Sequence, residues 1–261
     1  MRNTKACSFN RAHPKKGIKH PQVGLITIGQ SPRTDVSRGF REILEPYGVG
    51  VVETGVLDGL TFDEVRTKHT PNRSEKDAIV YVSRMRDGSE VKLLKSRVYL
   101  GVQQRLSELE PECDLIVVLC TGTFHGLNST VPVVFPDQIL HEHVRNLGIV
   151  TKLHVVAPAT EQKPFLTSKW TTTVDKLSFT ISSPYQKFRL ADVVGDIRAS
   201  QPEGVVLDCM GYRSEHKAMI LESFLQTGAE VDYQLATKIT QGDVPIILPQ
   251  ETVAKYVRNL L

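Results

Sequence analysis

Short apolar runs alternate with stretches of helical periodicity along most of the chain. The clearest runs lie at residues 23–29, 115–119, 153–159 and 205–207, and they are apolar enough for parallel strands that are covered on both faces. Two further strands are predicted at 49–56 and 177–181. Because strands that alternate with helices favour parallel sheets, the pattern predicts an α/β fold.

Capping residues predict where the helices begin and end. Ser31 is a good N-cap, and Pro32 suits the first helical position of a helix that follows the first strand. The sequence Thr61-Phe62-Asp63-Glu64 is a capping box for a short helix that must end before Pro71. Further helices are predicted over 96–110, over 188–199 and from an N-cap at Ser214 to a C-terminal Gly228.

Residues 79–95 alternate loosely between apolar and polar positions around Asp87-Gly88. This pattern predicts a β-hairpin with a tight turn. The hairpin carries four cationic side chains, namely Arg84, Arg86, Lys92 and Lys95. We expect a solvated ribbon, with a flap over a pocket as the alternative.

Residues 131–147 and 244–260 share seven identities in 17 aligned positions, and three more strand positions exchange one apolar residue for another. Each copy contains a short strand, a proline and a helix, which indicates an internal repeat. The repeat predicts two pseudo-symmetric α/β lobes, each a mostly parallel sheet flanked by helices, with the site in the cleft between them. We expect 23–136 plus 250–261 to form the first lobe and 137–249 the second.

The formal net charge of +3 hides an uneven distribution. Residues 1–22 hold six Lys and Arg side chains and no acid, so the rest of the chain has 26 basic against 29 acidic side chains. We therefore expect a basic, disordered tail and a folded body that does not bind nucleic acid. No apolar run is long enough to span a membrane and no signal peptide is visible, which favours a cytoplasmic protein without a membrane partner.

Four cysteines do not indicate a disulfide framework in a chain of 261 residues. No His/Cys cluster has the spacing of a zinc site, so no metal is expected. Cys7 lies in the basic tail and Cys113 at the entrance of a strand, and we interpret both as incidental. The other two cysteines carry the candidate chemistry.

Cys120 and Cys209 stand at strand ends, and each is followed by x-Gly. Cys120 follows the run 115–119, while Cys209 follows 205–207 after Asp208, which is either a base or a cap. Ligands of α/β folds bind at the carboxyl ends of strands, and a helix N-terminus beyond a cysteine lowers its thiol pKa. Two thiols on opposite sides of a cleft suit inversion at a carbon, because one sulfur removes the proton and the other returns one.

Groups near the two thiols are candidates for binding a substrate carboxylate. Backbone N–H groups at 121–123 and 210–212 can hold an anion and stabilise developing charge. The residues that we consider substrate-binding are Gln30, Ser31, Arg33, Thr121, Gly122, Thr123, Met210, Gly211 and Tyr212. No glycine-rich phosphate-binding loop follows the first strand, so no nucleotide cofactor is expected.

Arg33 and two histidines also have structural interpretations. A cation in the first turn opposes the helix dipole, so Arg33 either turns toward Asp35 or Glu53 or meets an anionic ligand. His125 and His216 follow the two thiols by five and seven residues. They either tune a thiol or occupy surface and cap positions.

Two segments resemble the AroM family, which is similar to the aspartate/glutamate/hydantoin racemase superfamily. They are VGLITIGQSPR at 23–33 and LDCMGY at 207–212, and the resemblance covers about residues 23–261. It implies a two-lobe α/β fold without a cofactor, in which paired cysteines act from opposite faces of the substrate carbon. Cys120 matches the first thiol of that pattern and Cys209 the second.

The motifs at the two thiols differ from those of the superfamily. Its racemases usually have Cys-Asn-Thr at the first thiol and Cys-Thr-His at the second, whereas this chain has Cys120-Thr121-Gly122 and Cys209-Met210-Gly211. The Asn and Thr that would hold an amino-acid carboxylate are missing or changed. The resemblance therefore does not carry an amino-acid substrate over to this chain.

Three functions remain open at this stage. The first is a cofactor-independent racemase, epimerase or isomerase that acts on a small carboxylate-bearing substrate, with Cys120 and Cys209 as acid and base. The second is a decarboxylase or cis–trans isomerase of the same fold that uses one thiol, for which Cys209 is the better candidate. The third is a non-enzymatic protein that binds a small anion. A homodimer is expected by analogy alone.

Overall fold

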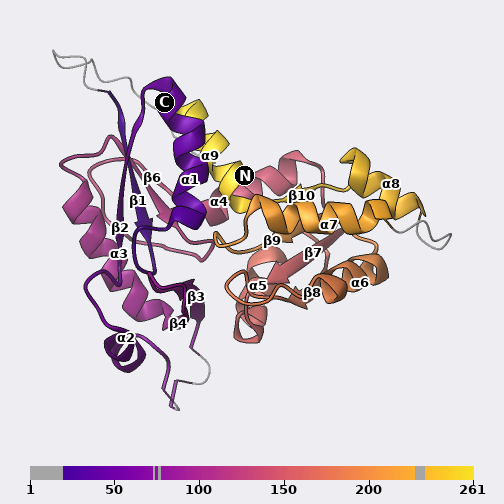
Figure 1. The fold of residues 1–261 in the computed structure, drawn as a ribbon, viewed down its shortest axis with the longest axis horizontal. Helices are drawn as coiled ribbons and strands as arrows, with labels where there is room; N and C mark the ends of the chain where they lie inside the picture. Colours follow the sequence, from indigo (N-terminus) through magenta and orange to yellow (C-terminus); the bar gives the residue numbers. More distant parts are fainter. Residues whose placement is uncertain (1–19, 73, 76–77, 227–232) are drawn as a thin grey trace, which may run out of the picture.

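The computed structural model describes residues 20–72, 74–75, 78–226 and 233–261. They form two α/β lobes, with the first half of the chain on the left of Figure 1 and the second half on the right. This confirms the fold class that the sequence predicts. The predicted tail up to residue 19 and the predicted C-cap Gly228 lie outside the described residues.

Each lobe contains a parallel sheet of four strands, and the two sheets have the same strand order. The first sheet runs β2 (Gly50–Gly55), β1 (Gln22–Thr27), β5 (Leu115–Leu119) and β6 (Val133–Val134). The second runs β8 (Lys176–Ile181), β7 (Lys152–Ala157), β9 (Gly204–Leu207) and β10 (Ile246–Ile247). In both sheets the first strand of the lobe lies between the second and the third, so the lobes are pseudo-symmetric.

Helices cover both faces of each sheet. Those of the first half are α1 (Thr34–Leu44), α2 (Phe62–Lys68), α3 (Lys95–Leu109) and α4 (Pro136–Asn146). Those of the second half are α5 (Lys163–Trp170), α6 (Leu190–Ser200), α7 (Ser214–Gln226), α8 (Tyr233–Gln241) and α9 (Pro249–Leu260). Short 3₁₀ turns lie at Glu45–Tyr47 and Thr160–Gln162. No helix in the described part of the chain is both long and apolar enough to cross a membrane.

The predicted internal repeat is present as a repeated structure. In each copy a two-residue strand leads into a helix whose first residue is a proline, Pro136 in α4 and Pro249 in α9. The residues before them, Phe135 and Leu248, have nearly equal backbone angles of φ −109°, ψ 115° and φ −105°, ψ 115°. The seven sequence identities therefore mark equivalent positions of the two lobes.

The two repeat helices pack on opposite lobes. Leu140 and Val144 of α4 lie in a buried cluster with the residues of β7. Val253 and Val257 of α9 lie in a buried cluster with β1, β5 and α1. Each sheet is thus covered in part by a helix that follows the short edge strand of the other sheet.

The first helix begins later than predicted. The sequence places Ser31 at the N-cap and Pro32 at the first helical position, whereas α1 begins at Thr34 with Arg33 at the N-cap. Asp58 accepts hydrogen bonds from the backbone N–H of Ser31 (2.7 Å) and from its hydroxyl (2.6 Å). Since the loop at Asp58 uses these groups, Ser31 is held outside the helix.

The hairpin and the capping box are confirmed, but the expected exposure of the hairpin is wrong. Strands β3 (Val80–Arg84) and β4 (Glu90–Leu94) pair antiparallel, and Thr61 and Glu64 form the capping box of α2. Tyr81 and Leu93 are almost fully buried in the core of the first lobe. Because one face of the hairpin packs into that core, it forms a wall of the site and is not a solvated ribbon.

Candidate functional site

Cys120 and Cys209 occupy the same backbone turn, one in each lobe. The N–H of each cysteine donates to the carbonyl two residues earlier, at 2.7 Å for Cys120 and 2.8 Å for Cys209. The N–H two residues later donates to the sulfur, at 3.3 Å from Gly122 and 3.4 Å from Gly211. Pseudo-symmetry therefore extends from the sheets to the two thiols.

Both cysteines line one small cavity between the lobes. Its other walls include Tyr81, Thr121 and Tyr185. The cavity has a volume of about 20 Å³, which is room for roughly one water molecule. A substrate larger than water enters only when one of the covering elements moves.

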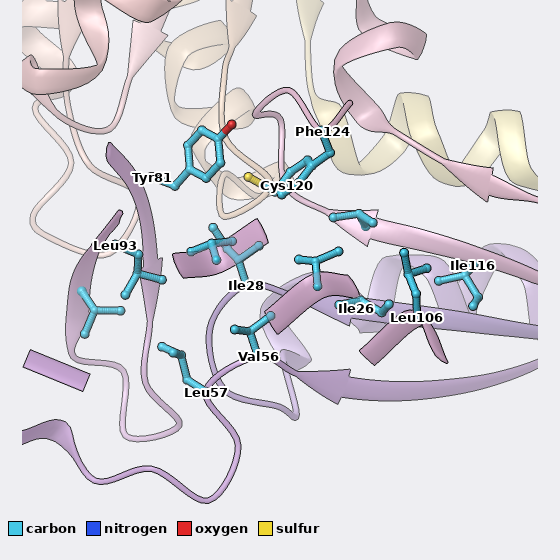
Figure 2. Packing of buried hydrophobic residues seen from close by; sticks show 14 of the residues in the cluster. Ile26, Ile28, Val56, Leu57, Tyr81, Leu93, Leu106, Ile116, Cys120 and Phe124 are labelled. Carbon is cyan, nitrogen blue, oxygen red and sulfur yellow. The ribbon is translucent and has the colours of Figure 1, made fainter. Parts of the chain in front are cut away.

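Two tyrosines that the sequence analysis missed cover the thiol turns. A Cβ atom at Gly122 would lie 2.3 Å from Cζ of Tyr81, and one at Gly211 would lie 2.3 Å from Oη of Tyr185. Figure 2 shows Tyr81 next to Cys120 within the cluster of buried residues of the first lobe. The x-Gly motif after each cysteine signals a close approach of another group, but only the fold shows that this group is a tyrosine.

Burial raises the pKa of both thiols, contrary to the sequence prediction. It raises the thiol pKa of Cys120 to about 12, and it also raises that of Cys209. No helix occurs in the described residues 121–132, and α7 begins only five residues after Cys209. The predicted helix N-termini are therefore not at the thiols, and the N–H groups of the two glycines lower the thiol pKa less than burial raises it.

Arg33 is buried and fully hydrogen-bonded. Its Nε and one Nη2 hydrogen donate to Asp35 (both 2.9 Å), and Nη1 donates to the hydroxyls of Thr27 and Ser83 (both 3.2 Å). The second Nη2 hydrogen donates to Oη of Tyr185 (3.0 Å). Since all five guanidinium hydrogens have acceptors, Arg33 binds a substrate carboxylate only by giving up one of these bonds.

Of the two interpretations of Arg33, the turn toward Asp35 or Glu53 agrees with its contacts in the structure. Asp35 accepts from the side chain, and Glu53 accepts from the backbone N–H of Arg33. Burial acts to lower the pKa of Arg33, but Tyr185 and Asp35 raise it well above its usual value, so the guanidinium is charged. Asp35 also pairs with Arg84 at 3.0 Å, which leaves this three-residue group with one net positive charge.

Asp208 is part of a buried ion pair that joins the two thiol turns. Its carboxylate accepts two bonds from Nζ of Lys169 (2.9 and 3.0 Å) and one from Nε1 of Trp170 (2.6 Å). Lys169 Nζ also donates to the carbonyl of Thr121 (2.9 Å). The side chains of Lys169 and Asp208 are 1% and 0% exposed. Asp208 is thus held in an ion pair with Lys169 at the lining of the cavity, and no helix begins at it.

Four of the predicted substrate-binding residues bind other parts of the protein, and none of them is among the described residues that line the cavity. The amide of Gln30 donates to the carbonyls of Leu57 and Leu60, Ser31 binds Asp58, Thr123 accepts from Lys95, and the Tyr212 hydroxyl donates to the carbonyl of Ser182. Each holds a loop in place. Their spacing along the chain gave no means of separating this role from substrate binding.

The two histidines also have structural surroundings. His125 is exposed and lies outside the cavity lining. The Nδ1 atom of His216 accepts from the backbone N–H of Arg213 (3.0 Å), and its ring packs edge-on against Phe188. Ser214 is the first residue of α7 and not its cap. His216 supplies the side-chain acceptor at this helix start, because its ring reaches back across the first turn.

The amide groups of Thr121 and Met210 remain candidates for binding an anion. Each follows a thiol directly and lines the cavity. Within the described residues, neither backbone N–H has a hydrogen-bond acceptor. No group of three or more His, Cys, Asp and Glu side chains among those residues is arranged to hold a metal ion.

The sequence matches the AroM protein family over residues 23–228, while a search of curated proteins finds no match. The fold is similar to that of the maleate isomerase Iso from Pseudomonas putida S16, with a TM-score of 0.57 and 12% identity over 93% of each chain. It is also similar to allantoin racemase from Klebsiella pneumoniae (TM-score 0.52, 14% identity, 92% of this chain and 87% of that one). Arylmalonate decarboxylase has a TM-score of 0.53 and 14% identity over 92% of each chain. These similarities show a shared two-lobe fold.

Proposed function

The chain belongs to the AroM protein family, and we propose that it is a cofactor-independent racemase, epimerase or isomerase that acts on a small carboxylate-bearing substrate. One observation carries this proposal: Cys120 and Cys209, at equivalent positions of two lobes, line one cavity. A racemase, a decarboxylase and an isomerase share the fold, which supports this class of reaction.

The proposed reaction is proton transfer between the substrate carbon and the two sulfurs. One sulfur, as thiolate, removes the proton from one face, and the other, as thiol, donates a proton to the opposite face. A thiol of high pKa is a weak acid, so its thiolate is a strong base once formed. In this proposal the N–H groups of Thr121 and Met210 bind the carboxylate and stabilise the developing negative charge.

Substrate entry requires the hairpin to move away from the second lobe. Four contacts hold it closed: Lys92 pairs with Glu161 at 2.5 Å, Glu90 accepts from the hydroxyl of Ser183 and from the amide of Gln186, and the carbonyl of Val80 accepts from Gln162. The pair of Lys92 and Glu161 lies on exposed side chains (40% and 49%), where an ion pair is individually weak. The hairpin is therefore the element that we expect to open.

Proton exchange with solvent tests the proposal. We would incubate the protein in heavy water with 2-amino, 2-hydroxy and cyclic-amide acids and follow deuterium at the α carbon by NMR. Two-base chemistry predicts that Cys120→Ser and Cys209→Ser each abolish inversion. Cys113→Ser is the matched control, since this buried cysteine lies outside the cavity lining. Absence of exchange with every candidate acid would contradict the proposal.

One observation favours the one-thiol alternative, in which the protein is a decarboxylase or a cis–trans isomerase. A tyrosine hydroxyl contacts Cys209 but not Cys120, so the two sulfurs are not chemically equivalent. In that case Cys120→Ser keeps its activity while Cys209→Ser loses it. A protein that only binds a small anion would keep its ligand affinity in both variants.

A further inference from the structure

The two thiol turns match in backbone but differ in how their tyrosines are hydrogen-bonded. Oη of Tyr185 lies 3.6 Å from Sγ of Cys209. Tyr81 holds the corresponding place over the Cys120 turn, yet its hydroxyl donates to the carbonyl of Thr123 at 3.0 Å. The pseudo-symmetry of the site is therefore broken at the sulfur atoms.

The contact between Arg33 and Tyr185 fixes the direction of the phenol hydrogen. A guanidinium can only donate, so the phenol oxygen of Tyr185 is the acceptor of the 3.0 Å bond from Arg33. Its own hydrogen then points to Sγ of Cys209 whenever that sulfur is a thiolate. Together with the N–H of Gly211, Cys209 has two donors, whereas Cys120 has one.

The charges around Cys209 act in both directions. The nearby titratable or charged groups are Arg33, Asp35, Arg84, Glu53, Glu90, Asp208, Lys169, Tyr185, Tyr212 and Cys120. Arg33 favours the thiolate of Cys209, whereas Asp208 disfavours it although Lys169 pairs with Asp208. Burial raises the pKa of the Cys209 thiol, and the hydrogen bond from Tyr185 and the charge of Arg33 act to lower it.

We propose that Tyr185, held by Arg33, is a positioning residue that makes Cys209 the sulfur that ionises first, so that Cys209 is the base and Cys120 the acid of the resting protein. The catalytic part of this inference rests on the proposed function. The Cys209 thiol releases its proton to solvent, and the thiolate then takes the substrate proton while the Cys120 thiol gives its own to the opposite face. The next turnover in the same direction needs a solvent proton at Cys120 and the release of one from Cys209.

Alkylation of the two cysteines tests the inference without any substrate. We would expose the protein to iodoacetamide over a pH series and measure the rate at each cysteine by mass spectrometry. In the wild-type protein Cys209 should react faster than Cys120. Tyr185→Phe keeps the ring over Gly211 and removes only the hydroxyl. Loss of a hydrogen bond to a charged group raises the thiol pKa by about one to two, which lowers the thiolate fraction. We therefore expect the alkylation rate at Cys209 to fall about 10- to 100-fold.

Two controls separate this effect from a change in access. Cys120 lines the same cavity, so its own rate reports how often the cavity opens. Tyr81→Phe is the matched variant on the pseudo-symmetric tyrosine and should leave the ratio of the Cys209 rate to the Cys120 rate unchanged. A faster Cys120 in the wild-type protein, or an equal ratio in wild-type and Tyr185→Phe proteins, overturns the inference. If only the proposed function is wrong, no deuterium exchange occurs at the α carbon of any candidate acid, while Cys209 still reacts faster than Cys120 and Tyr185→Phe still lowers that ratio.

Discussion

The buried ion pair of Lys169 and Asp208 offers the sharpest test of how the site is held together. In Lys169→Met the methionine fills the space of the lysine stem but carries no charge. The Asp208 carboxylate then loses two of its three hydrogen bonds and keeps the one from the N–H of Trp170. The carbonyl of Thr121, in the other thiol turn, loses its donor as well.

The magnitude follows from the burial of the pair. Both side chains are at most 1% exposed, so the carboxylate left behind is an uncompensated buried charge, which costs about 3–5 kcal/mol. For a protein of this size, each 1 kcal/mol lowers the melting temperature by about 2–4 °C, so the expected loss is roughly 6–20 °C. Removing both charges in Lys169→Met/Asp208→Asn should recover a large part of that loss, because no unpaired ion remains.

Urea unfolding followed by circular dichroism measures these changes in the free energy of unfolding. Lys163→Met, which changes an exposed lysine on the same helix, is the control and should stay within about 0.5 kcal/mol of wild type. A loss below about 1 kcal/mol for Lys169→Met, or a double variant no more stable than the single one, would refute the reasoning.

Three further predictions concern packing, pH and opening. Gly211→Ala places a Cβ 2.3 Å from Oη of Tyr185, and it should lower the free energy of unfolding in urea by about 1–3 kcal/mol. The control is Gly195→Ala, on a helix with open space around it, which should raise that free energy by about 0.5–1 kcal/mol. Equal effects of the two variants would contradict the packing of Tyr185 on Gly211. Burial lowers the pKa of His154 from 6.5 to about 4, so only the unfolded chain binds this proton between those values. The neutral His154 therefore stabilises the folded protein above pH 6.5, and this part of the free energy of unfolding declines by up to about 3 kcal/mol as the pH falls to 4. His154→Gln should remove this part of the pH dependence. If the free energy of unfolding changes with pH equally in the wild-type protein and in the variant, this prediction is wrong. Glu90→Gln weakens the closure of the hairpin and should speed hydrogen exchange in β3 and β4; unchanged exchange would show that the hairpin is not the opening element.

The fold was predictable because its strands are buried on both faces and its repeat is visible as identical residues in the two copies. A run such as 115–119 reads as a covered parallel strand without further information, and Pro136 and Pro249 mark equivalent helix starts. The first helix start was missed because Asp58, 27 residues further along, takes the hydrogen-bonding groups of Ser31. Local capping rules do not include such a competitor.

The candidate site was predictable only in part, for a similar reason. The two cysteines stood out because each ends an apolar run and precedes x-Gly. The groups that define their chemistry are distant in sequence: Tyr185 reaches Cys209 across 24 residues, and Lys169 reaches Asp208 across 39. No local sequence pattern indicates the roles of Tyr185 and Lys169, since a tyrosine after a strand and a lysine on a helix are common. The expected lowering of the thiol pKa failed because burial, a property of the folded chain, is the largest cause.

The packing of α9 on the first lobe has a consequence for synthesis on the ribosome. One face of β1 and β5 is covered by α1 together with Val253 and Val257 of α9, and that helix begins 130 residues after the end of β5 (Leu119 to Pro249). Until it emerges, the first lobe carries an uncovered apolar surface beside α1. Burial of β1 and β5 is therefore completed by a helix that is translated long after both strands, and a nascent first lobe would depend on chaperones or on its own transient collapse in the meantime.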